Sequence, residues 1–152
     1  MKTVILIPAR YASTRYPGKP LAELTLADGS RKSLIQMSYE AAMKVRGVDA
    51  VYVATDDARI KAAAEAFGAD VIMTAESCAN GTERCANALE RAGLSADIIV
   101  NLQGDAPLTP PWFVEALIDE VKRDSDVGMA TPVLRADPQT LRRFREDRKQ
   151  GC

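Results

Sequence analysis

Hydrophobic residues gather into short runs along the chain, and longer stretches of mixed polarity separate these runs. The runs are rich in Val and Ile, a pattern typical of strands that are buried on both faces of a sheet. We therefore expect strands at residues 4–7, 51–54, 71–73 and 98–102, and a further strand-like segment at residues 127–133.

The stretches between the runs place hydrophobic residues at the spacing of one helix face. Asn80 and Glu83 have the spacing of a capping box, and Asp57 is also suited to begin a helix. Gly68 and Gly93 are placed to end helices. We expect helices at residues 33–45, 57–67, 80–92 and 110–121, with a weaker helical segment at residues 140–148.

Strands that alternate with helices indicate right-handed βαβ units. The sequence therefore predicts an α/β fold with a doubly wound, mainly parallel sheet and flanking helices. A length of 152 residues suits a single domain. In open sheets of this kind, ligands bind beyond the carboxyl ends of the strands. This rule directs attention to the loops that follow Ile7, Ala54 and Leu102.

Composition narrows the classes of function. The formal net charge is -1, so the chain sets up no strong field for nucleic acid or a membrane surface. The first apolar run is too short to be a signal or a membrane span. The chain contains no His, which removes the commonest general base and metal ligand. Cys78, Cys85 and Cys152 form no C-x-x-C pair, which disfavours zinc and suggests reduced thiols in the cytoplasm.

The loop after the first strand carries three cations, Arg10, Arg15 and Lys19, with no carboxylate among them. Such closely spaced like charges repel one another unless an anion lies between them, and a polyphosphate would supply several oxygens. Gly18 permits a tight turn, and Ser13 adds a hydroxyl donor. On charge alone a solvated basic loop is the better interpretation, but the position at a strand end favours phosphate binding. The loop matches neither the Walker nor the dinucleotide glycine pattern.

Asp105 follows another buried strand and a glycine. A carboxylate in this position can bind Mg2+ against substrate phosphates, or it can simply stabilise a turn before Pro107. The basic loop across the sheet favours the metal. Arg84 lies in the first turn of a helix, against the preference set by the helix dipole, which indicates a separate role for this side chain.

Residues 7–15 and 17–21 closely resemble the opening motif of the 3-deoxy-manno-octulosonate (KDO) cytidylyltransferases. Four further motifs follow in the order and approximate spacing of that family, at residues 53–57, 73–74, 80–84 and 100–105. The resemblance extends from residue 2 to about residue 134, and the series of motifs is far more specific than any one of them. One departure is Ala106, where the family usually has Glu.

The resemblance implies an enzyme that joins CTP to KDO, giving CMP-KDO and pyrophosphate for lipopolysaccharide or capsule synthesis, with Mg2+ as cofactor. It implies that Arg10, Arg15, Lys19 and Asp105 carry catalysis, and that Asp105 holds the metal. It further implies nucleotide contacts from Ala9, Ser13, Thr74, Gly81, Thr82 and Arg84, and a sugar contact from Gln103. The whole chain is then one nucleotidyltransferase domain, incomplete at its C-terminus, and the full-length form is expected to be a homodimer.

Two alternatives stay open. The first is a related transferase for another acid sugar such as a sialic acid, although residues 13–15 and 80–84 fit the KDO type better. The second is a non-catalytic nucleotide-binding remnant, which Ala106 and the abrupt end after Cys152 favour. Family members are considerably longer, and their later half supplies a second metal-binding Asp. We therefore expect the chain alone to bind CTP weakly and to turn over poorly.

Overall fold

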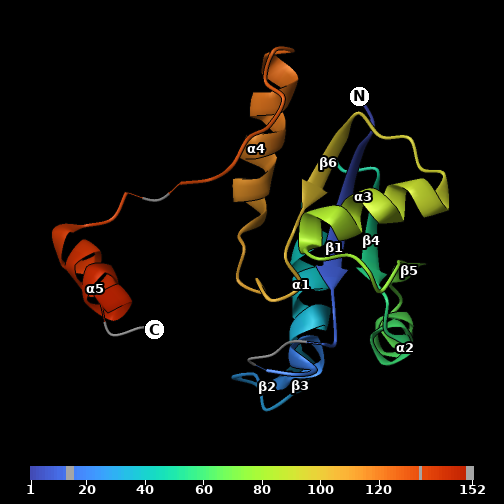
Figure 1. The fold of residues 1–152 in the computed structure, drawn as a ribbon, viewed down its shortest axis with the longest axis horizontal. Helices are drawn as coiled ribbons and strands as arrows, with labels where there is room; N and C mark the ends of the chain where they lie inside the picture. Colours follow the sequence, from blue (N-terminus) through green and yellow to red (C-terminus); the bar gives the residue numbers. More distant parts are fainter. Residues whose placement is uncertain (13–15, 134, 150–152) are drawn as a thin grey trace.

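The computed structural model describes residues 1–12, 16–133 and 135–149. Its centre is a four-stranded sheet with the strand order β5-β4-β1-β6, and every neighbouring pair is parallel (Figure 1). The strands are β1 (Thr3–Ala9), β4 (Ala50–Thr55), β5 (Asp70–Met73) and β6 (Ile98–Asn101). The predicted α/β fold with a mainly parallel sheet is confirmed, as are all four strands of this sheet.

Strand β1 is buried along its whole length because it has a parallel neighbour on each side and helices on both faces. Its side chains alternate between two hydrophobic clusters, as the two-residue period of a strand requires. Ile5 and Ile7 join the larger cluster, whereas Val4 and Leu6 join the smaller one. This double burial explains why the run at residues 4–7 is continuously apolar.

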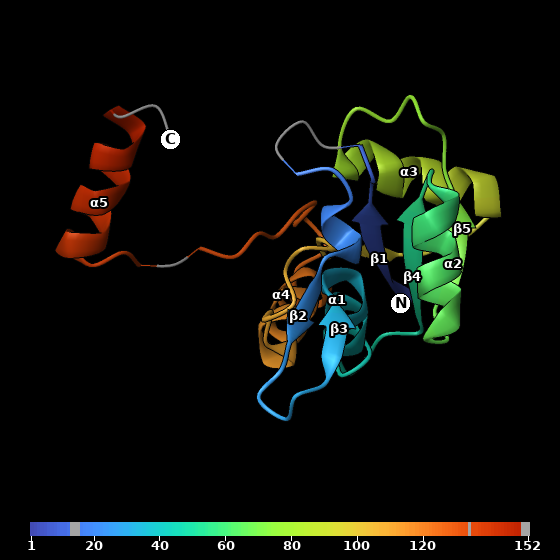
Figure 2. The same cartoon turned by 90° about the horizontal axis from the view of Figure 1, so that it is seen from below.

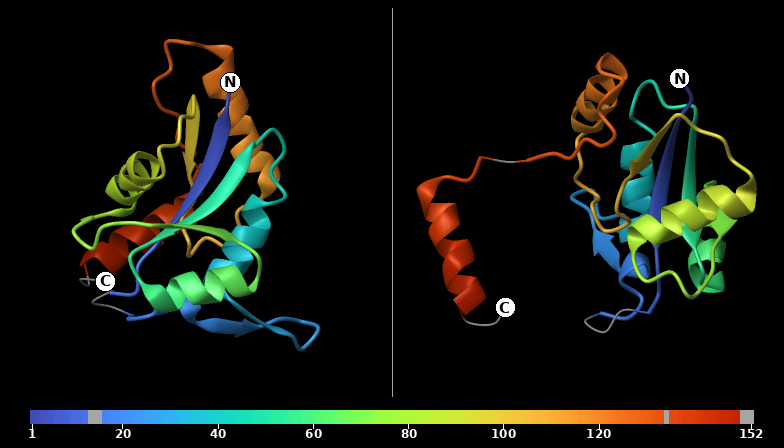
Figure 3. Two further views of the ribbon diagram at one scale, coloured as in Figure 1. Left: turned by 90° about the vertical axis from the view of Figure 1, so that its right-hand side faces the viewer. Right: turned by 45° about the horizontal axis from the view of Figure 1, so that its top comes forward.

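The two faces of the sheet carry different helices. α1 (Leu34–Ala42), α2 (Ala58–Ala66) and α4 (Pro111–Arg123) supply the larger cluster, and α3 (Gly81–Ala92) covers the opposite face (Figure 3). Cys85 of α3 is a core residue with 4% exposure, and burial raises the pKa of its thiol to about 11. The thiol is therefore held in its unreactive, protonated form at neutral pH.

The helix ends follow the predicted capping pattern. Asp57 accepts a hydrogen bond from the backbone N–H of Arg59, and Asn80 accepts one from that of Glu83. Glu83 reaches back to the N–H of Ala79 at 2.8 Å, one residue earlier than in an ideal capping box. Gly93 ends α3 in the left-handed conformation, with φ of 58°.

Two parts of the fold differ from the expectation. Residues 127–133 form no strand, and Met129 and Val133 are more than 80% exposed, at 84% and 85%. Their apolar pattern favours a strand, but among the described residues no neighbouring strand pairs with them. A short hairpin, β2 (Glu23–Thr25) with β3 (Arg31–Ser33), was not predicted because each strand has only three residues.

The helical segment predicted at residues 140–148 is confirmed as α5 (Pro138–Lys149). It lies away from the sheet and its covering helices in two perpendicular views (Figures 1 and 2). A one-turn helix, η1 (Lys19–Leu21), completes the set of elements. Among the helices of the described residues, none combines the length and apolar character that a membrane span requires.

We expect Ile7→Ala to lower the free energy of unfolding by about 2–5 kcal/mol, since it opens a cavity in the central strand. Urea denaturation measures this change. The matched control is Ile99→Ala on the edge strand β6, where the side chain is 43% exposed and the loss should stay below about 1 kcal/mol. Equal losses at the two positions would contradict the assignment of the core.

Candidate functional site

A pocket of about 610 Å3 opens where the carboxyl ends of β1 and β6 meet the N-terminus of α3. This is the edge of the sheet at which the fold class predicts ligand binding. The residues that line the pocket are Pro8, Ala9, Arg10, Tyr16, Lys19, Pro20, Ala79, Asn80, Gly81, Arg84, Gln103, Gly104 and Asp105.

The structure brings most of the predicted site residues together. The predicted residues that line the pocket are Ala9, Arg10, Lys19, Gly81, Arg84, Gln103 and Asp105. Thr74 and Thr82 are not among the described lining residues, and Ser13 and Arg15 lie outside the residues that the structure describes. Pro8, Tyr16 and Ala79 line the pocket although they were not predicted to be site residues, since they carry no charge. Asn80, which was predicted mainly as a helix cap, lines it as well.

Lys19 and Asp105 meet across the mouth of the pocket. The Lys19 Nζ lies 2.6 Å from the Asp105 Oδ2, although 86 residues separate them in the sequence. Both side chains are nearly half exposed, at 47% and 44%, so the ion pair stabilises the fold by less than about 1 kcal/mol. The arrangement therefore places an ammonium and a carboxylate side by side, held so weakly that a ligand can separate them.

The turn that carries Asp105 is held tightly against the end of β1. Ser38 on α1 donates a buried hydrogen bond to the carbonyl oxygen of Gly104 at 3.0 Å. A Cβ atom at Gly104 would lie 3.1 Å from Ile35 Cδ1 and 3.2 Å from the carbonyl oxygen of Pro8. A larger residue would push this turn outward, so glycine is what lets Asp105 lie close to β1.

A second close approach brings α3 to the pocket. A Cβ atom at Gly81 would lie 3.2 Å from Pro8 Cγ and 3.3 Å from Gln103 Nε2. Gln103 in turn donates from Nε2 to the Asn101 Oδ1 at 2.8 Å, which fixes the direction of its amide. The N-terminus of α3 thus reaches the pocket wall, and the N–H groups of a helix N-terminus favour anions.

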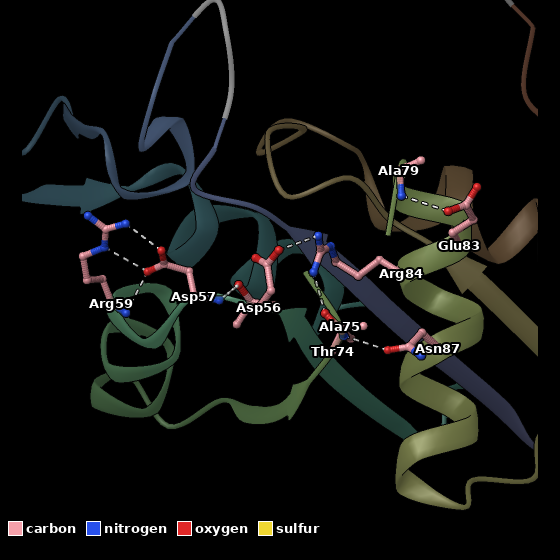
Figure 4. A network of polar contacts seen from close by, with 10 residues as sticks. Asp56, Asp57, Arg59, Thr74, Ala75, Ala79, Glu83, Arg84 and Asn87 are labelled. Atoms are coloured by element: carbon pink, nitrogen blue, oxygen red, sulfur yellow. Dashed lines mark hydrogen bonds and ion pairs between the residues drawn. The ribbon is translucent and has the colours of Figure 1, made fainter. Parts of the chain in front are cut away.

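Arg84 occupies a buried position in the same wall. It is 2% exposed, and its Nη2 lies 2.9 Å from the Asp56 Oδ2. Its Nη1 donates to the Thr74 hydroxyl (Figure 4). Asp56 follows β4 and Thr74 follows β5, so one guanidinium ties the ends of two strands to the first turn of α3. The buried ion pair accounts for a cation at a helix start.

Asp56, the partner of Arg84, was not predicted to be a site residue. The loop after Ala54 was expected to face the ligand, but no residue of that loop lines the pocket among the described residues. Two adjacent carboxylates after β4, Asp56 and Asp57, were the available signal. Each of them holds one guanidinium, that of Arg84 and that of Arg59 respectively.

The donor set suits a metal ion shared with a ligand, and it does not form a metal cage. Among the described residues no group of three or more His, Cys, Asp or Glu side chains gathers at one point. Mg2+ commonly takes one or two carboxylates and completes its shell with substrate phosphates and water. Asp105 is the one carboxylate among the described lining residues of a pocket that also contains cations, and it fits that pattern.

The chain is similar to one group of known proteins. A family model described as cytidylyltransferase matches residues 4–144. A 3-deoxy-manno-octulosonate cytidylyltransferase of Maricaulis maris is 44% identical over 151 residues, which is 99% of this chain and 56% of that protein. An 8-amino-3,8-dideoxy-manno-octulosonate cytidylyltransferase of Shewanella loihica is 47% identical over 133 residues, covering 86% of this chain and 52% of that protein.

A solved structure supports the same grouping. The structure of CMP:2-keto-3-deoxy-manno-octonic acid synthetase complexed with CTP superposes with a TM-score of 0.77 at 43% identity. The match covers 84% of this chain and 50% of that chain. This chain therefore spans about half the length of the curated relatives it matches.

We expect Asp56→Asn to lower the free energy of unfolding by about 2 kcal/mol, because it leaves the buried Arg84 guanidinium without a charged partner. Chemical denaturation followed by circular dichroism measures the loss. Glu65→Gln is the control: it breaks the exposed pair with Lys61 and should change stability by less than about 0.5 kcal/mol. A loss at Asp56 as small as this control would refute the structural role of the buried pair.

Proposed function

This chain belongs to the cytidylyltransferase family, and on that premise we propose that it binds CTP and takes part in activating 3-deoxy-manno-octulosonate. In the reaction, the anomeric hydroxyl of the sugar attacks the α-phosphorus of CTP. The new bond gives a CMP-sugar, and the bond to the β-phosphate breaks to release pyrophosphate. Catalysis of this kind depends on positioning and on neutralising a crowded anionic centre.

The observation that carries the proposal is the meeting of Lys19 and Asp105 at 2.6 Å. Two loops far apart in sequence, one basic and one acidic, deliver these groups to the same end of the sheet. Arg10 lines the pocket beside them and is exposed, so its guanidinium is available to an anion. In the proposal, Arg10 and Lys19 neutralise the phosphates, and Arg15 and Ser13 of the same loop assist.

Asp105 is the residue that we propose holds Mg2+ together with the nucleotide phosphates. The ion, when bound, would polarise the α-phosphate and favour loss of the proton from the attacking hydroxyl. The chain itself contains no His that could act as a general base. Its own contribution would then be to bind and orient: Asp105 would hold the metal, and Lys19 would neutralise charge on the leaving pyrophosphate.

The nucleotide contacts divide into direct and indirect ones. Ala9 and Gly81 line the pocket and have little or no side chain, so we propose that their main chain contacts the nucleotide. Arg84 is proposed to contact it only through its most exposed edge, since its guanidinium is occupied by Asp56 and Thr74. Thr74 therefore contributes through Arg84.

Asn101 links Thr82 to Gln103. Asn101 Nδ2 lies 3.5 Å from the Thr82 hydroxyl, and Asn101 Oδ1 accepts from Gln103. We place the acid sugar next to Gln103, whose amide this link orients, and Thr82 would support it from behind. Cytoplasmic location and a homodimeric full-length form remain predictions from the resemblance.

The names of the relatives differ in the substrate sugar. The relative from Maricaulis maris is named for KDO, and the one from Shewanella loihica, with a similar sequence identity, is named for the 8-amino-3,8-dideoxy sugar. A pyrophosphate-release assay with CTP and each sugar in turn, with a sialic acid as the third arm, decides between them. Release with KDO alone supports the proposal, release with only the amino sugar corrects it, and release with none contradicts catalysis by this chain.

We expect Asp105→Asn to weaken CTP binding in the presence of Mg2+ and not to weaken it in its absence. With Mg2+, loss of the metal ligand should weaken binding about tenfold or more. Without Mg2+, binding should be unchanged or tighter, because Lys19 is no longer paired with a carboxylate. Isothermal titration calorimetry measures both affinities.

Asp28→Asn serves as the control, since this carboxylate lies in the β2–β3 turn and binds Ser30 instead of lining the pocket. It should leave both affinities as they are in the wild type. An equal effect of Asp105→Asn in the two buffers would remove Asp105 from the metal site.

A further inference from the structure

An arginine from α2 covers the first aromatic ring of the basic loop. The Arg59 Cζ lies 3.3 Å from the centroid of the Tyr11 ring, which is within the range of a cation–π contact. Arg59 comes from the segment after β4, and Tyr11 comes from the segment after β1. The contact therefore joins two neighbouring strand ends, beside the pocket described above.

The Arg59 guanidinium is fixed in place by Asp57. Its Nε lies 3.0 Å from Asp57 Oδ1, and its Nη2 lies 2.6 Å from Asp57 Oδ2 (Figure 4). The same carboxylate begins α2 by accepting the backbone N–H of Arg59 at 2.8 Å. A guanidinium held by two parallel hydrogen bonds keeps one orientation. Asp57, at the start of α2, therefore holds the Arg59 guanidinium over the Tyr11 ring.

Tyr11 connects Arg59 to Gly18. The Gly18 N–H donates to the Tyr11 carbonyl oxygen at 2.9 Å, which joins these two residues through the main chain. Gly18 has a φ of 72°, and a Cβ atom there would lie 2.8 Å from the Tyr11 Cε2. The ring therefore packs directly against a glycine that no other residue could replace without strain. Lys19 is the next residue.

We propose that Arg59 and Tyr11 are positioning residues, which hold Gly18 and the adjacent Lys19 in place, so that Lys19 stands beside Asp105 before a nucleotide binds. The inference rests on the proposed function of the pocket. Neither Arg59 nor Tyr11 is among its described lining residues, so both act through Lys19. A lysine that is already in position binds an anion with a smaller entropic cost, and this clamp, the contact of Arg59 with Tyr11, contributes to affinity in this way.

The test separates this mechanism from simple attraction between Arg59 and the phosphates. Removing the cation with Arg59→Met and removing the ring with Tyr11→Leu should each weaken Mg2+–CTP binding by roughly two- to fivefold. The conservative variants Arg59→Lys and Tyr11→Phe keep a cation and a ring, and they should restore most of the affinity. Calorimetry gives the dissociation constants, and thermal melts confirm that each variant is folded.

The double variant is the decisive measurement. If Arg59 acts through Tyr11, then Arg59→Met causes no further loss in the Tyr11→Leu background. If Arg59 attracts the phosphates at a distance, the two losses multiply, and the proposal is overturned. The control is Lys61→Met on the same helix, an exposed cation of the same charge that pairs with Glu65 and should leave the affinity unchanged.

A measurement without nucleotide keeps the two proposals distinguishable. The Gly18 amide should exchange with solvent roughly two- to fivefold faster in Arg59→Met than in wild type or Lys61→Met, as followed by NMR. An unchanged exchange rate of the Gly18 amide would overturn the proposal that Arg59 and Tyr11 form a clamp. If the wild type binds no CTP, the proposed function fails, and the role of the clamp in nucleotide binding fails with it. If CTP binds normally to every variant, only the clamp is wrong.

Discussion

Parallel pairing of β1 with β6 is the constraint on which the pocket depends. Both strands run in the same direction, so their carboxyl ends meet at one edge, and the loops that follow them face each other. This is how Lys19 and Asp105 come within hydrogen-bonding distance. β1 can serve as the common reference because both of its faces are buried, which fixes its position more firmly than that of any edge strand.

Two kinds of ion pair serve different purposes around the pocket. The Arg84–Asp56 pair is nearly buried, so separating it leaves a charge in a poorly solvated place, and it acts as a permanent tie between strand ends and α3. The Lys19–Asp105 pair is half exposed and contributes little to stability. Water can solvate either partner when a ligand takes the other. Burial, more than the distance between the charged atoms, determines which pair can exchange partners.

The fold was largely predictable because its strands and helices have strong local signals. The continuous apolar run of β1 and the capping residues Asp57 and Asn80 each act within a few residues of sequence. Residues 127–133 were misjudged because a strand also needs a partner, which a local pattern cannot report. The candidate site was predictable where charge gathered at strand ends, as at Lys19 and Asp105. Asp56 was missed because its partner is chosen by the packing of α3 against β4 and β5.

Two glycines shape the wall of the pocket beside Pro8. Gly81 and Gly104 bring α3 and the Asp105 turn close to Pro8, where a Cβ atom on either glycine would be crowded. Glycine and proline lose almost no side-chain freedom on folding, so this part of the wall keeps its shape whichever molecule rests on it. Variation in ligand choice among homologues would then arise at lining residues with longer side chains, such as Arg10 and Gln103. The wall beside Pro8 would act as a rigid template that successive substitutions leave intact.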